Sequence, residues 1–253
     1  MKNSIAKKTA FILGILFIFI VWIIGEAVKD NSYIFPSVSD TFDALVDLFT
    51  EPNIYKHTYK VLGYTLLRLT ISVVGCFVLG TILALLAYRF KAIKWFFKPS
   101  ISLFKTLPIA VVIILLWVLS KDFAPYYIVS VVVLPVVYEA VLIGLENISS
   151  DILDEVKLNC GITPKVIFKV LLPIVFPAIL TALIQSIGLG LKVLVMAEYI
   201  MQTEYSIGNE FIYYKEISME MEYLYAWSII LIIFVLLFEI IISYISKKKD
   251  LVL

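Results

Sequence analysis

The chain has 253 residues, of which 62% are hydrophobic and 16% charged, and its mean hydropathy is +1.00. Soluble domains hold about 45–50% apolar and about 25% charged residues. This composition therefore excludes an ordinary soluble protein and indicates an integral membrane protein. A formal net charge of +1 argues against nucleic acid as a main partner.

Six apolar runs are long enough to cross a hydrocarbon core of about 30 Å as helices. The sequence thus predicts an all-α, polytopic membrane protein whose six transmembrane helices cover about 10–28, 65–88, 101–119, 124–145, 170–200 and 224–245. The first run is longer than the apolar part of a signal peptide, and no small-residue cleavage site follows it, so we expect it to remain as an anchor.

Lys and Arg are distributed unevenly between the two sides of these spans. One side holds the N-terminal residues, the segments 89–98 and 146–169, and the C-terminal residues. Together they carry most of the Lys and Arg outside the spans. Cytoplasmic loops carry this excess, so we expect both termini in the cytoplasm. The acidic segments 40–51 and 204–222 then lie outside.

The outer segment after the first span predicts a short helix. Apolar side chains recur at helical spacing over 42–49, and Ser39 or Asp40 can cap the helix. Two interpretations stay open: a docking surface for an external partner, or an amphipathic helix that only covers the bundle.

The polar segment 154–173 interrupts the apolar runs on the cytoplasmic side. A Ser or Asp at 149–151 can cap a first short helix, Gly161 can end it in the left-handed conformation, and Thr163 and Pro164 can open a second helix. Four residues are expected close to one face of this segment, where they form an apolar ridge: Ile152, Leu153, Val156 and Cys160. The ridge either enters a groove of another protein or belongs to an ordinary loop along the membrane.

Charged residues inside the spans are costly, at about 2.5–3.5 kcal/mol each, so they line a cavity, pair, or lie near an end. Arg68 lies near the outer end of the second span and is expected either to pair or to line a path. Lys192 and Glu198 lie in the fifth span, turned about 240° apart around a helix, and form either a gate or substrate path or buried structural pairs. Glu139 is expected to be paired or to face the bundle interior.

Small residues and prolines are expected to shape the packing of the spans. Glycines let helices approach closely in lipid, and prolines bend them. The residues expected to act in this way are Gly75, Gly80, Gly188, Gly190, Pro173 and Pro177.

No set of residues predicts catalysis or a metal site in this chain. Cys76 and Cys160 are expected to be free thiols, because metal ligands need clustered spacing. The only histidine, His57, has no nucleophile beside it in the sequence and is expected at the surface. The sequence contains no Gly-x-x-x-x-Gly-Lys-Ser/Thr phosphate loop, so the chain is not expected to bind ATP in that manner.

The polar segment resembles a known docking loop. Asp154 and Glu155 open it, Gly161 follows, and Leu172-Pro173 closes it, a pattern similar to the EAA loop of ABC importer permeases. Val156 and Lys157 replace the two alanines of that family.

Motifs on either side resemble the nitrate, sulfonate and taurine branch of the same family. They are Thr65-Leu-Leu-Arg68, Lys105-Thr-Leu-Pro108 with Trp117, and Ala197-Glu198 followed by Ser206-Ile-Gly208.

The resemblance implies a type I ABC importer permease of the cell membrane, either inner or plasma membrane. Residues 1–60 would form an anchor with an external amphipathic segment, and 61–253 the permease core with a coupling loop at about 146–169. Partners would be ABC ATPase subunits carrying ATP and Mg, an extracytoplasmic binding protein and a second permease copy, most simply a homodimer. The solute would be a sulfonate, taurine or nitrate-like anion or a heteroaromatic vitamin precursor.

The resemblance also implies roles for particular residues. The ATPase-coupling residues would be Asp154, Glu155, Val156, Cys160, Gly161, Thr163 and Pro164. The translocation path or gate would include Lys192, Glu198, Arg68 and Glu139. The rival interpretation is a standalone secondary transporter without an ATPase partner, which predicts inverted repeats and discontinuous spans around a midplane site.

Overall fold

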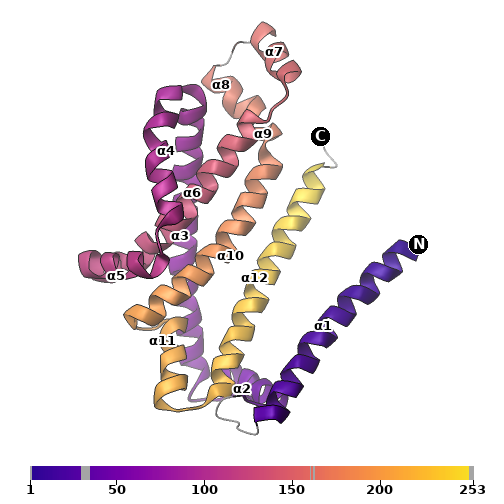
Figure 1. Cartoon of the computed structure of the whole chain (residues 1–253), viewed down its shortest axis with the longest axis vertical. Coiled ribbons are helices and arrows are strands. Elements are labelled where there is room, and N and C mark those ends of the chain that lie inside the picture. The colour runs from indigo at the N-terminus through magenta and orange to yellow at the C-terminus, as the bar shows by residue number, and fades with distance from the viewer. Residues whose placement is uncertain (1, 30–34, 160, 162, 251–253) are drawn as a thin grey trace.

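Long apolar stretches of this chain form helices because a helix satisfies every backbone polar group without water. The computed structural model describes residues 2–29, 35–159, 161 and 163–250, and every regular element there is helical. Four long helices run roughly along one axis (Figure 1): α3 (Tyr55–Arg89), α6 (Ala124–Glu146), α10 (Phe176–Met201) and α12 (Met221–Asp250). A fifth, α1 (Lys2–Lys29), is inclined to them. The all-α prediction is confirmed.

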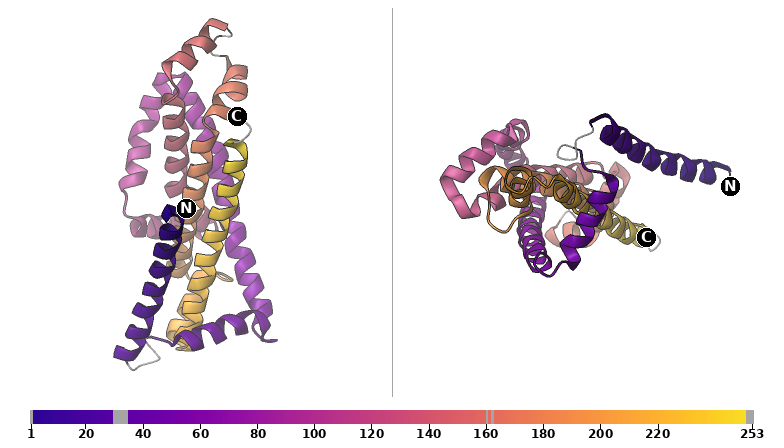
Figure 2. Two further views of the ribbon diagram at one scale, coloured as in Figure 1. Left: turned by 90° about the vertical axis from the view of Figure 1, so that its right-hand side faces the viewer. Right: turned by 90° about the horizontal axis from the view of Figure 1, so that it is seen from below.

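Within the described residues, four helical segments are long and apolar enough to cross a membrane, rather than the six predicted. They are Tyr55–Arg89, Ile109–Glu146, Phe176–Met201 and Met221–Tyr244. The first predicted span corresponds to a shorter apolar stretch, Ile12–Val28, within α1. Figure 1 and the right-hand view of Figure 2 show α1 leaving the bundle. Near the C-terminal end of α1, Trp22 donates a hydrogen bond to the carbonyl of Pro36 at 3.1 Å.

The third predicted span, 101–119, is wrong as a single helix. It consists of the end of α4 (Lys91–Thr106) and most of α5 (Ile109–Ser120), which projects sideways from the bundle (Figure 1). Leu107 and Pro108 between them have extended backbones, with ψ of 131° and 121°. A residue before proline avoids the helical region, and proline has no N–H to donate, so the chain breaks there.

The predicted outer helix exists as α2 (Val38–Thr50), which lies across one end of the bundle (Figure 2). The capping prediction was wrong by a few residues. Ser37, not Ser39 or Asp40, is the cap: it is extended, and its Oγ accepts the backbone N–H of Asp40 at 2.9 Å. Ala44 and Leu48 are buried against the bundle.

The core lies where α3, α6 and α10 pack together, and two of the four predicted packing glycines sit there. A Cβ on Gly80 would lie 3.0 Å from Val137, and one on Gly190 would lie 3.2 Å from Leu69. Gly75 has no described atom within 4 Å of such a Cβ, and Gly188 has only Val235 at 3.8 Å. Gly75 and Gly188 therefore do not set close helix contacts within this chain.

The fifth predicted span begins irregularly, as its prolines indicated. The segment before α10 contains a π-helical turn, Ile167–Leu171, and a short helix α9 (Leu172–Ile174), after which Val175 leaves helical geometry. Pro173 and Pro177 stand on either side of this break. The helix is therefore interrupted near the start of the span, between the two prolines predicted to bend it.

Candidate functional site

The polar segment forms two short helices at one tip of the molecule. α7 (Ser150–Asn159) projects beyond the bundle, and α8 (Pro164–Val166) leads back to it (Figure 1). The backbone N–H of Leu153 donates to the carbonyl of Ser149 at 3.1 Å, which starts the first turn. Asp154 and Glu155 lie on the exposed side of α7, and Val156 is half-buried.

The link between the two helices has the geometry that the sequence predicts. Gly161 has φ of +65°, a left-handed conformation that costs glycine little and other residues more. Thr163 then caps α8, because its Oγ1 accepts the N–H of Val166 at 3.4 Å, and Pro164 takes the first helical position. Cys160 lies outside the described residues.

The apolar residues of α7 do not form the single ridge that was predicted. Leu153 packs against the core of the bundle, whereas Ile152 is on the exposed side. The most exposed apolar side chain of the segment is Leu158, at 87%. Leu158 was not among the predicted site residues, although a large apolar residue between Lys157 and Asn159 is a visible signal in the sequence.

At the other end of the bundle, a buried polar network joins α3 to α10. The Glu198 side chain is 0% exposed, and its carboxylate lies 3.1 Å from the Arg68 guanidinium, whose side chain is 13% exposed. Thr65 donates to both carboxylate oxygens, at 3.1 and 3.0 Å. The two charges therefore form a buried, hydrogen-bonded ion pair.

The same network holds the chain that follows α10. Arg68 donates to the carbonyls of Glu204 and Tyr205, at 3.1 and 3.3 Å. Thr65 Oγ1 accepts the N–H of Ile207 at 3.2 Å, at the start of α11 (Ile207–Ile212). A Cβ on Gly208 would lie 2.3 Å from the backbone nitrogen of Tyr199, so only glycine fits at this approach.

A ring of aromatic and charged side chains surrounds this network at the bundle end. The ammonium of Lys60 lies 3.2 Å from the ring centroid of Tyr205, which also stacks on Tyr64. His57 is 47% exposed, and its Nε2 lies 2.8 Å from Oε1 of Glu210, which is buried. Sequence analysis placed His57 at the surface but missed Glu210, which lies far away along the chain.

The helical turn after α11 adds a buried tyrosine to the same end. Tyr214 is buried and stacks on Tyr223, with ring centroids 4.8 Å apart. Burial, with the nearby charge of Glu210, raises the pKa of the Tyr214 hydroxyl above its ordinary value. The hydroxyl therefore stays neutral through the physiological range.

The two remaining candidate path residues lie outside the network. Lys192 is exposed on α10, in a groove shared with Val235 and other apolar residues of α12. Glu139 on α6 pairs with Lys105 of α4, with Nζ and Oε2 2.6 Å apart. The structure thus brings Arg68 and Glu198 together, and it places Lys192 and Glu139 elsewhere.

Two solved structures share this fold. They are crystal forms of the inward-facing MetNI methionine ABC transporter, with TM-scores of 0.64 and 0.67. Each is 17% identical to this chain over 79% of it and 98% of the matched chain, an identity at which likeness shows the fold alone. No curated protein matches the sequence.

A family-level match covers most of the chain and joins the fold to a biological role. Residues 77–250 match the family described as "Binding-protein-dependent transport system inner membrane component". This range includes the projecting helices α7 and α8 and the Glu198 side of the buried network. The chain therefore belongs to the family of binding-protein-dependent transport system inner membrane components, the multi-pass permease subunits of ABC importers.

Proposed function

We propose that this permease forms the membrane path of its importer and that α7 and α8 are the docking site of the ATPase. The single observation that carries the proposal is the projecting helix–Gly161–helix segment, in a chain of this family. Asp154, Glu155, Val156, Cys160, Gly161, Thr163 and Pro164 are the proposed coupling residues. α7 stands clear of the bundle, and its exposed Leu158 supplies an apolar contact that a partner's groove could bury.

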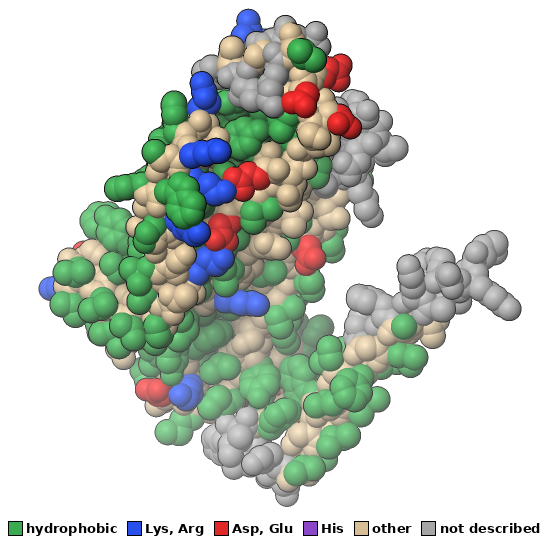
Figure 3. Space-filling model, turned by 45° about the horizontal axis from the view of Figure 1, so that its top comes forward, with side chains coloured by type: hydrophobic (Ala, Val, Ile, Leu, Met, Phe, Trp, Pro, Cys, Tyr) green, Lys and Arg blue, Asp and Glu red, His purple; other side chains and the backbone are tan. Residues whose placement is uncertain are grey.

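We place α7 and both termini in the cytoplasm. Lys and Arg side chains gather on the face around α4, toward the end that carries α7 (Figure 3), which is the bias expected of cytoplasmic segments. From the end that carries α2, α1 and α12 both run toward the end that carries α7; α12 ends near it, and α1 ends at about mid-height (Figure 1). The chain then crosses the membrane six times, and the third crossing is made by α4 and α5 in sequence.

The partners follow from the same role. ATP and Mg bind to two ATPase subunits, an extracytoplasmic binding protein delivers the solute to the α2 and α11 end, and a second copy of this chain completes the path as a homodimer. The solute is a small sulfonate, taurine or nitrate-like anion, or a heteroaromatic vitamin precursor.

The buried network is the proposed outer gate element. Arg68 and Glu198 join α3 to α10, and Thr65 and Gly208 bind α11 to both, so these three helices move together at the outer end. Closure of the ATPases would pull α7 and α8, rotate α10, and shift this unit. Lys192 is proposed to face the path elsewhere along its length, whereas Glu139, paired with Lys105, is proposed to hold α4 against α6.

Co-purification of the permease with its ATPase tests the docking proposal. A candidate ABC ATPase is co-expressed with the permease and captured through a tag on the permease. Glu155→Arg is expected to lower ATPase recovery severalfold, because it reverses a charge on the exposed side of α7. Glu51→Arg is the matched control, since Glu51 is exposed beside α2 at the opposite end.

Two results would decide against the proposal. If wild-type protein never retains an ATPase and still transports solute, the chain works as a standalone transporter. If Glu155→Arg and Glu51→Arg retain the ATPase equally, α7 is not the docking site.

A further inference from the structure

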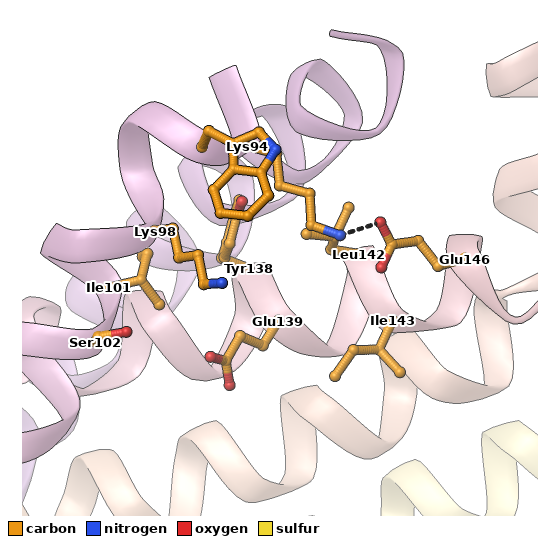
Figure 4. Close-up of a pocket in the computed structure, with 10 residues that line it drawn as sticks. Lys94, Lys98, Ile101, Ser102, Tyr138, Glu139, Leu142, Ile143 and Glu146 are labelled. Atoms are coloured by element: carbon orange, nitrogen blue, oxygen red, sulfur yellow. Dashed lines mark hydrogen bonds and ion pairs between the residues drawn. The ribbon is translucent and has the colours of Figure 1, made fainter. Parts of the chain in front are cut away.

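A groove of about 400 Å³ opens between α4 and α6, toward the end that carries α7. The charged and aromatic side chains that line it come from both helices (Figure 4): Lys94, Trp95 and Lys98 from α4, and Tyr138, Glu139 and Glu146 from α6. Ile101, Leu142 and Ile143 add an apolar surface to the same groove. The groove is therefore charged at one part and apolar at another.

The groove lining holds two Lys and two Glu, so its formal charges balance, but its ion pairs leave one Lys without a carboxylate partner. Lys94 pairs with Glu146, with Nζ and Oε1 2.5 Å apart, and Glu139 is paired with Lys105. Lys98 makes no ion pair with a described carboxylate, and its ammonium points into the groove (Figure 4). Its described contact is the ring of Trp95, with the centroid 4.5 Å away. Because Lys105, from outside the lining, pairs with Glu139, the ammonium of Lys98 is left without a carboxylate, and an anion would complement it.

The surroundings of Lys98 indicate what kind of anion fits. Trp95 and Phe96, at 66% and 74% exposed, stand on the outer surface of α4 beside the lysines. Exposed aromatic rings next to Lys and Arg are typical of the zone where lipid head groups meet acyl chains. The apolar side of the groove, at Ile101 and Ile143, would suit a hydrocarbon chain. A small free anion would leave that side empty.

We propose that this groove binds the head group of an anionic phospholipid. The phosphate would lie on Lys98, and the part of the acyl chain nearest the head group would lie against Ile101 and Ile143. Basic pockets between transmembrane helices are known to accept such head groups. The binding itself depends only on the groove. Its assignment to the cytoplasmic leaflet rests on the orientation given under the proposed function.

Native mass spectrometry of the purified permease tests the proposal. The protein, in a mild detergent, is titrated with phosphatidylglycerol or with phosphatidylcholine of the same acyl chains. Wild-type protein is expected to retain phosphatidylglycerol selectively. Lys98→Gln is expected to weaken this retention about fivefold, the effect of one Lys at an anionic surface. Lys56→Gln, which removes an exposed Lys beside Tyr55 at the opposite end, is expected to change nothing.

A second variant predicts a change of the opposite sign. Glu146→Gln frees Lys94 from its partner and adds a net positive charge to the groove, so phosphatidylglycerol should be retained more tightly. Damage to the fold would not tighten binding, which separates the charge effect from a structural one. The double variant Lys94→Gln/Glu146→Gln leaves the net charge of the groove unchanged. It is expected to lose less of its phosphatidylglycerol retention than Lys98→Gln.

Several outcomes would overturn the proposal. Equal retention of the two lipids, or equal loss in Lys98→Gln and Lys56→Gln, would show that the groove does not select an anionic lipid. Displacement of the lipid by inorganic phosphate at millimolar concentration would assign the site to a free anion instead. A disulfide between two copies of Lys98→Cys would show that a second chain covers the groove. None of these measurements uses the ATPase, so they fail or succeed independently of the proposed function.

Discussion

The buried pair of Arg68 and Glu198 allows the sharpest test of how this permease is held together. Glu198 is fully buried and Arg68 nearly so. The carboxylate also accepts two hydrogen bonds from Thr65 and one from the backbone of Gly208. Arg68→Met removes the only basic side chain that pairs with this carboxylate in the described part of the chain. The variant therefore leaves a desolvated charge behind.

The magnitude follows from the burial. Removing one partner of a buried ion pair costs about 3–5 kcal/mol, since the remaining charge has no compensation. Replacing both partners by apolar residues costs much less, because no charge remains to be desolvated. The double variant Arg68→Met/Glu198→Met is therefore expected to be more stable than Arg68→Met alone, although it contains one substitution more.

Thermal unfolding in detergent, followed by intrinsic fluorescence, measures this order. Arg89→Met is the matched control: it makes the same substitution in α3 at an exposed position, where changes usually stay within about 0.5 kcal/mol. The reasoning is refuted if Arg68→Met unfolds at the temperature of Arg89→Met. It is refuted equally if the double variant is no more stable than Arg68→Met.

Three further variants test other parts of the structure. Gly208→Ala should destabilise the permease by about 1–3 kcal/mol, because its Cβ meets backbone, whereas Gly188→Ala should unfold like wild type; the same thermal assay compares them. Gly161→Ala should lower ATPase recovery without changing permease unfolding, since it strains only the link at φ +65°. The raised pKa of Tyr214 means that its contribution to stability is fully present below pH about 10 and is lost progressively as the pH rises toward the folded-state pKa, so the unfolding temperature of wild type should fall relative to that of Tyr214→Phe above pH about 10. Tyr213→Phe, at an exposed tyrosine, should not differ from wild type in that comparison.

The sequence was sufficient to predict the all-helical class and the local backbone geometry around Gly161. A hydrophobic run shows directly how long and how apolar a helix is. Glycine and proline change the backbone of their nearest neighbours, so their effects are also visible in the local sequence. The third span failed because Leu107 and Pro108 are as apolar as the residues around them. A hydropathy window does not detect a break in the backbone, although the proline in Lys105-Thr-Leu-Pro108 indicates that the helix can end there.

The candidate site was predictable only in part. Arg68 and Glu198 stood out as charges inside spans, but they are separated by 130 residues, and no local pattern indicates that they meet. The cap of α2 was placed wrongly because Ser37, Ser39 and Asp40 are all capping types, and only the backbone geometry after Pro36 selects Ser37. Pairing across helices depends on packing, which sequence spacing does not encode.

The break between α4 and α5 has a consequence for where water can be. The last carbonyls of α4 and the first N–H groups of α5 have no partners in a continuing helix, and hydrocarbon cannot satisfy them. Thr106 and Leu107 are exposed there, so this chain does not bury the break by itself. Irregular backbone at membrane depth persists only where protein encloses it or where it lines a hydrated cavity. Where α4 and α5 cross the membrane as proposed, the turn at Pro108 is thus a point at which water or another chain must cover the backbone.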